Sequence, residues 1–305
     1  MNISAWQLLL ISAVYLSVIF TIAYLSEKGW FPLRWIRSPF IYVLSLGVYA
    51  SAWSYYGAVG LSYQFGYGYL AFYLGVCGAF LLAPVLLLPI LRVTKTYQLS
   101  SIADLFAFRY RSQVAGTLST LFVGIATFIL MAIQFQVVQI SIKAMTGSAP
   151  GIAVGTGFCL LMILSTIFFG ARGQSRTDRH PSLMLCIALE GLLKLAIFLL
   201  LGGVVVYHTF GGFTEMNQWL NLNSMSTEVL KQTLDDGAWR ALLLLFFASA
   251  LVMPHMFHMT FTENQNQQAL YKASWGLPLY LLLMSLPGPI FMWAGVKLDL
   301  QTDPS

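Results

Sequence analysis

The chain has 305 residues, of which 58% are hydrophobic and only 9% are charged, and its mean hydropathy is +0.75. This composition lies well beyond that of soluble domains, and it leaves no room for a soluble catalytic domain. We attribute the net charge of +5 to loops held on the cytoplasmic side of a membrane, because Lys and Arg resist translocation.

Eight apolar stretches approach or exceed the roughly 20 residues that a helix needs to cross the hydrocarbon core of a bilayer. They cover residues 5–25, 39–60, 68–91, 116–142, 151–170, 182–207, 240–261 and 276–296. The first lacks a basic leading region, so we interpret it as a retained span and not as a signal peptide. The sequence therefore predicts an all-helical, polytopic membrane protein.

The loops differ in charge from one side of the predicted membrane to the other. Loops 26–38, 92–115, 171–181 and 262–275 carry eleven Lys and Arg residues, and the opposite side carries four. This bias predicts that these four loops face the cytoplasm and that the N-terminus lies outside. The C-terminus then also lies outside, in the polar run LDLQTDPS, and we expect the chain to be a truncated module of a longer protein.

Two predicted spans contain residues that interrupt helices. Span 39–60 has Gly47, Ser51, Ser54 and Gly57 at its centre, and span 240–261 contains Pro254, which removes a helical hydrogen bond. Interrupted helices at matching positions, here five spans apart, are typical of the binding site of inverted-repeat transporters. Ordinary packing kinks are the alternative, and this feature alone does not decide between them.

Two loops are predicted to contain short helices. Loop 92–113 has apolar residues at the spacing of an amphipathic interfacial helix, namely Leu99, Ile102, Leu105 and Phe106. Ser100 or Ser101 is suited to cap this helix, with Asp104 in its first turn. Loop 208–238 is polar enough to be external, and we expect a short helix at 225–234.

Charged residues are rare inside the spans, and Glu190 and Lys194 stand in the middle of span 182–207. Their spacing of four places them on one helix face, in the order that favours an ion pair. A paired charge costs far less in hydrocarbon than either charge alone. The pair is a candidate gating or coupling element, and the alternative is a structural pair that fixes helix packing.

Other polar side chains inside the spans are weaker candidates. Gln136 and Gln139 share a face of span 116–142, where amides bind a polar solute or sodium, or hold helices together. His255 and His258 flank Pro254, but no third ligand of that type is near, so we predict a gate or packing role and no metal site. Trp53, at mid-span, either lines a cavity or packs the core.

Five separated segments resemble sodium:solute symporters, and especially the symporter-like N-terminal membrane module of bacterial sensor histidine kinases. They are VYASAWSYYGAVG, SSIADLFAFRYRS, ATFILMAIQFQVVQISI, FFGARGQSRTDRHPSLMLCIALEGLLKLAIF and MPHMFHMTFTENQNQQALYKASWGLPLYLLLMSLPGPI. The last resembles the kinase-associated variant, although His255 and Tyr49 depart from family patterns. The resemblance covers nearly the whole of residues 1–305, in order.

The resemblance implies a LeuT-type bundle of two inverted five-helix repeats preceded by one extra span, here incomplete because the second repeat has only two helices. It also implies that backbone carbonyls at Gly47 and Ala50 bind sodium, the expected ion, with no organic cofactor. Ser51, Trp53, Gln136 and Gln139 are then candidate solute contacts. Glu190, Lys194, Pro254 and His255 are candidate gating or coupling residues.

The leading functional hypothesis is sodium-coupled transport or sensing of a small polar solute, such as an amino acid or organic acid, across a bacterial inner membrane. The chain is then the membrane region of a two-component sensor histidine kinase, with a fused or downstream kinase as partner and no catalytic domain of its own. A plain symporter fragment and a non-transporting structural subunit are the alternatives. No feature points to nucleic acid.

Overall fold

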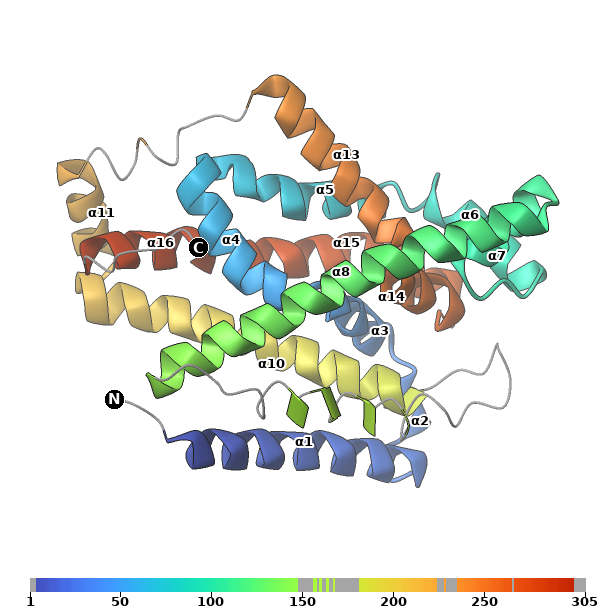
Figure 1. The fold of residues 1–305 in the computed structure, drawn as a ribbon, viewed down its shortest axis with the longest axis horizontal. Helices are drawn as coiled ribbons and strands as arrows, with labels where there is room; N and C mark the ends of the chain where they lie inside the picture. The colour runs from blue at the N-terminus through green and yellow to red at the C-terminus, as the bar shows by residue number, and fades with distance from the viewer. Residues whose placement is uncertain are drawn as a thin grey trace.

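The computed structural model describes residues 4–147, 181–223, 235–264 and 266–298, together with a few single positions between 156 and 167 and at 228. These residues form helices and connecting turns, and no strand occurs among them (Figure 1). Backbone polar groups inside a bilayer need partners within their own segment, and helices satisfy that requirement. The predicted all-helical membrane bundle is confirmed.

Four helical stretches of the described chain are long and apolar enough to cross a membrane. They contain α1 (Ala5–Glu27), α8 (Gln113–Thr146), α10 (Pro181–Val205) and the pair α15 (Gln267–Ser285) and α16 (Pro287–Lys297). A fifth joins α13 (Asp236–Val252) to α14 (Pro254–Phe257) and the π-helix η5 (His258–Thr262), with a bend of 56°. These elements match five of the predicted spans.

Two predicted spans are divided. Span 39–60 consists of α3 (Pro39–Ser45), the 3-10 turn η1 (Leu46–Tyr49) and α4 (Ala52–Phe65). Span 68–91 is divided into α5 (Leu70–Leu81) and α6 (Leu87–Thr96), which the prediction treated as one unbroken stretch. Pro84 lies between them and has no N–H to continue the helix, so the Ala83 N–H turns back to the Phe80 carbonyl at 2.9 Å.

The short helix predicted in loop 92–113 is present as α7 (Ile102–Tyr110). Ser101 caps it, because its hydroxyl accepts from the Asp104 N–H at 3.0 Å and the Asp104 carboxylate accepts from the Ser101 N–H at 3.1 Å. The capping prediction at Ser101 is therefore confirmed.

Other short elements connect the long helices. They are α2 (Leu33–Ile36), η2 (Gly66–Tyr69), the π-helix η4 (Val206–Phe210) and α11 (Phe213–Leu222). Within loop 208–238, α11 lies earlier than the helix expected at 225–234. That expected helix and most of span 151–170 lie outside the described residues.

The buried core lies where α3, α5, α14 and α15 meet. Helix α5 lies close against α13, since a Cβ built on Gly75 would be 2.7 Å from the Phe246 Cβ. Helix α8, by contrast, has no buried residue among those described, and it crosses the bundle obliquely in Figure 1. The core therefore surrounds the two broken helices and not α8.

Candidate functional site

The first break lies between η1 and α4. Ala50 has a non-helical backbone (φ −75°, ψ 85°), and Ser51 is extended (φ −89°, ψ −174°). The Ser54 N–H, which would bond Ala50 in a continuous helix, instead bonds the Ser51 carbonyl at 2.9 Å. The break therefore releases the Ala50 carbonyl oxygen from the helical pattern, as the sequence predicted for this region.

The second break lies at Met253, whose extended backbone (φ −61°, ψ 126°) is the conformation favoured before a proline. Pro254 then begins α14 at a position where its missing N–H costs no hydrogen bond. The π-helix η5 follows within the same span. Span 240–261 thus has both a bend and a widened turn.

Two hydrogen bonds join the broken spans side by side. The hydroxyls of Tyr49 and Ser249 are 3.1 Å apart, and the Tyr42 hydroxyl donates to the Thr260 carbonyl at 3.0 Å. The earlier residue of one span thus pairs with the later residue of the other, so the two spans run antiparallel. This is the relation that two broken helices have in an inverted repeat.

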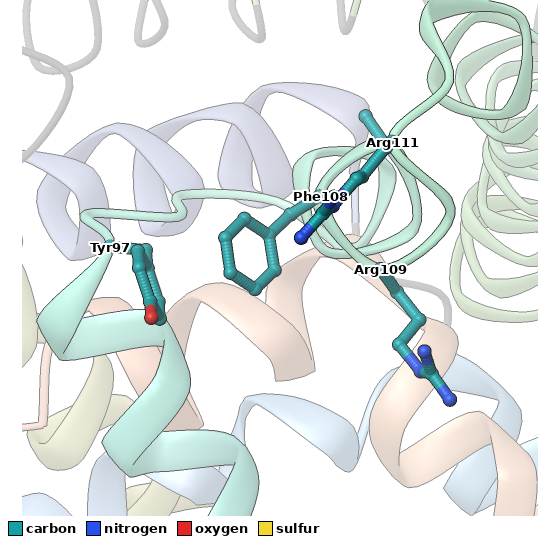
Figure 2. A pocket seen from close by; sticks show the side chains of 5 residues that line it. Tyr97, Phe108, Arg109 and Arg111 are labelled. Carbon is teal, nitrogen blue, oxygen red and sulfur yellow. The ribbon is translucent and has the colours of Figure 1, made fainter.

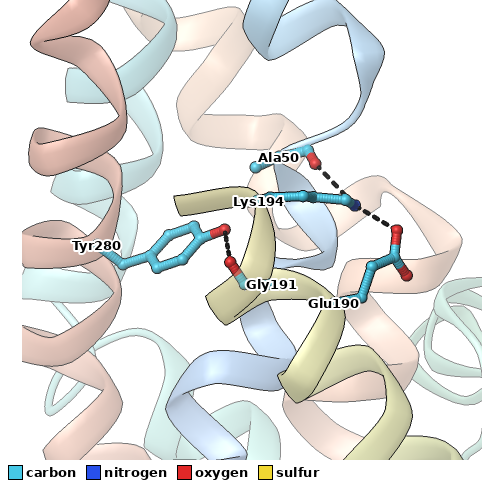
Figure 3. A network of polar contacts seen from close by, with 5 residues as sticks. All are labelled: Ala50, Glu190, Gly191, Lys194 and Tyr280. Carbon is cyan, nitrogen blue, oxygen red and sulfur yellow. Dashed lines mark hydrogen bonds and ion pairs between the residues drawn. The ribbon is translucent and has the colours of Figure 1, made fainter. Parts of the chain in front are cut away.

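The predicted ion pair is present on α10 and reaches the first break (Figure 3). The Lys194 ammonium lies 2.7 Å from a carboxylate oxygen of Glu190 and donates to the Ala50 carbonyl at 3.4 Å. Both side chains are partly buried, with exposed fractions of 27% for Lys194 and 37% for Glu190. The pair therefore supplies a positive charge to the carbonyl that the break has released.

Close packing fixes this part of α10. A Cβ on Gly191 would lie 2.8 Å from the Leu44 carbonyl oxygen, so only glycine permits this approach of α10 to α3. The Tyr280 hydroxyl donates to the Gly191 carbonyl at 3.0 Å (Figure 3). A Cβ on Gly47 would in turn lie 3.0 Å from the same tyrosine ring. The backbone positions of the ion pair and of the break are thus held together by α15.

Aromatic rings and two hydroxyls without partners surround the start of α4. Tyr49 stacks on Phe72 with centroids 5.1 Å apart, and the Tyr73 hydroxyl donates to the Ser54 carbonyl at 3.1 Å. The buried hydroxyls of Ser54 and Tyr55 have no hydrogen-bond partner among the described residues. Buried polar atoms without partners are uncommon, and a bound solute or water is one way to satisfy them.

The remaining predicted residues are only partly brought to this site. Gly47, Ala50 and Ser51 form the break itself, whereas Pro254 and His255 begin α14 and are exposed. Gln136 and Gln139 are exposed on α8, and among the described residues neither side chain has a hydrogen bond to the break. Trp53 lies in the first turn of α4, and its side chain lies outside the description.

A second polar cluster lies at the end of span 240–261, and the sequence did not predict it. Glu263 and Asn264 are buried, with His258 Nε2 at 3.2 Å from a Glu263 oxygen. The Lys95 ammonium of α6 donates to the Asn264 side-chain oxygen at 3.3 Å. His258 and Glu263 are five apart, a spacing that a π-helix brings together and an α-helix does not. The polar ending Thr-Glu-Asn of an apolar span was the available signal.

A cavity of about 640 Å³ lies between the end of α6 and the last turns of α7 and is lined by Tyr97, Ala107, Phe108, Arg109 and Arg111 (Figure 2). The rings of Tyr97 and Phe108 are 4.2 Å apart. The cavity lies in a segment predicted to face the cytoplasm, and no residue of the two breaks lines it.

Paired broken helices with an intramembrane ion pair are typical of membrane transporters. The uncharacterized symporter YhjB of Bacillus subtilis (strain 168) is 25% identical to this chain over 257 residues, which are 82% of the chain and 50% of that protein. The chain thus spans about half the length of this relative. No protein-family model matches the chain, and no solved structure matches it significantly. Fold and similarity support a symporter-type membrane protein, while sodium coupling and the kinase link stay predictions.

Proposed function

We propose that the chain is the solute-binding membrane module of a symporter, which moves a small polar solute together with sodium. The observation that carries the proposal is the antiparallel contact of the two broken spans, made through Tyr49 and Ser249. The hydroxyls of Ser54 and Tyr55 beside the first break, which have no partner among the described residues, offer a solute partners for its polar groups. The similarity to a protein named a symporter supports the same class.

Uptake into proteoliposomes tests this proposal. The protein, purified as its own gene encodes it, is reconstituted and supplied with radiolabelled amino acids and organic acids, with an inward sodium gradient or with choline in place of sodium. We expect saturable uptake of at least one solute above that of empty liposomes, and faster uptake with sodium. Absence of uptake for every solute contradicts transport.

Solute sensing in a two-component kinase is the second candidate, favoured by the resemblance of the segment from Met253 to Ile290 to kinase-associated modules. The same fold serves both roles, because a sensor needs the binding site and not the transport cycle. Sequencing the reading frame beyond residue 305 distinguishes them. An in-frame dimerisation and ATP-binding region supports the sensor, and further spans followed by a stop codon contradict it.

A further inference from the structure

The two carbonyls expected to hold sodium already have donors in this structure. The Gly47 oxygen accepts from the Ala50 N–H at 2.9 Å, and the Ala50 oxygen accepts from the Lys194 ammonium at 3.4 Å. Each oxygen therefore already has one partner in the conformation described, and at Ala50 that partner carries a positive charge. The positive charge at this break is therefore the ammonium group of Lys194.

We infer that the Lys194 ammonium is a tethered cation that competes with sodium for the Ala50 carbonyl. It thereby raises the sodium concentration at which the protein binds this ion. The inference rests on the proposed function for its biological meaning, but the competition itself is a property of the site. Two positive charges at one carbonyl repel each other, and the repulsion is strong where water is scarce. Sodium must therefore displace the ammonium before it can bind there.

Glu190 provides a second oxygen for the exchange. Its carboxylate lies 2.7 Å from the ammonium, so this nitrogen is held between a carboxylate oxygen and the carbonyl oxygen of Ala50 (Figure 3). Oxygen atoms of these two types are the ligands that hard cations prefer. If the ammonium is removed, the same two oxygens remain, and the negative charge of the carboxylate suits a sodium ion between them.

The proposed exchange moves the Lys194 side chain and leaves α10 in place. The backbone of α10 is fixed next to Lys194, because Gly191 lies against the Leu44 carbonyl and accepts from Tyr280. The lysine side chain keeps an exposed fraction of 27%, so it has space in which to swing away. We expect the exchange to change the lysine rotamer and to leave the backbone of α10 where these contacts hold it.

Direct sodium binding tests the inference without reference to transport. Equilibrium binding of radioactive sodium ions is measured on the detergent-purified protein as wild type, K194M, K194R and E190Q/K194M. We expect K194M to bind sodium at least about tenfold more tightly than wild type, because the competing ammonium is gone. K194R keeps a positive charge at the same place, so it should bind as weakly as wild type.

The double variant separates the contribution of the carboxylate. We expect E190Q/K194M to bind sodium more tightly than wild type but less tightly than K194M, because the carbonyl is free and the carboxylate is lost. If K194M is not recovered folded, this charge-neutral variant provides the comparison with wild type.

Equal sodium affinity of wild type and the lysine-free variants overturns the inference, as does a lack of sodium binding in those variants. Loss of solute uptake with the expected order of sodium affinities would instead contradict only the proposed function.

Discussion

At the scale of single residues, Gly191 controls how closely α10 approaches α3. We expect Gly191→Ala to destabilise the protein by about 1–3 kcal/mol, because the new methyl group meets a backbone oxygen that cannot turn aside. Gly203→Ala is the matched control on the same helix, since its Cβ would meet nothing within 4 Å. Thermal unfolding in detergent compares the two variants. Equal unfolding temperatures would contradict close packing of α10 against α3 at Gly191.

The Glu190–Lys194 pair gives a second prediction at this scale. Each single neutralisation leaves one charge without its partner, and we expect it to cost about 1–3 kcal/mol of stability given the partial burial of both groups. E190Q/K194M should cost less than the sum of the two single changes. A double-mutant cycle of unfolding free energies measures this coupling. Additive effects would mean that the pair contributes nothing.

The sequence predicted local contacts between residues and missed distant ones. The Glu190–Lys194 pair follows from a spacing of four on a helix, which needs no knowledge of the fold. The contact of Lys194 with Ala50 spans 144 positions and depends on how α10 packs against the broken helix. The contact of His258 with Glu263 is local but relies on a π-helix, and no feature of the sequence signalled that widened turn.

At the scale of elements, the breaks were predictable where proline or a cluster of small residues interrupts an apolar stretch. Pro254 and the run around Gly47 and Ser51 both mark real breaks. The division of span 68–91 was not predicted, although Pro84 lies within it, because the stretch is hydrophobic throughout. The exposure of Gln136 and Gln139 was also not predictable. Their spacing shows that they share a face of the helix, but not which element that face contacts.

The break at Met253 leads to a prediction about Pro254. Pro254→Ala restores an N–H that can bond the carbonyl four residues earlier, so we expect α13 and α14 to merge. Stability should change by less than about 1 kcal/mol, because Pro254 is exposed and begins a helix. Solute uptake should nevertheless fall strongly. Pro278→Ala, within the unbroken helix α15, is the control. Full uptake by Pro254→Ala would show that transport does not depend on the break at Met253.

At the scale of the whole molecule, the charge bias predicts the orientation. A cysteine at Ser112, which begins α8 after a basic loop, should resist a membrane-impermeant maleimide applied to intact cells. A cysteine at Asn223, exposed at the end of α11 on the opposite side, should react under the same conditions. Both are placed in a background without Cys77, Cys159 and Cys186. Reversed reactivity would invert the topology.

The central claim is that solute binds where the two broken spans meet, and bulk placed in the first break tests it most directly. Ser51 lies half-buried between η1 and α4, whereas Ser17 is exposed on α1 and provides the same substitution at a distant place. The measurement is equilibrium binding of the solute identified by uptake, on membranes that contain equal amounts of Ser51→Trp, Ser17→Trp or wild-type protein. We predict that Ser51→Trp loses binding and that Ser17→Trp retains it. Unchanged binding by Ser51→Trp would contradict the account and place the site elsewhere.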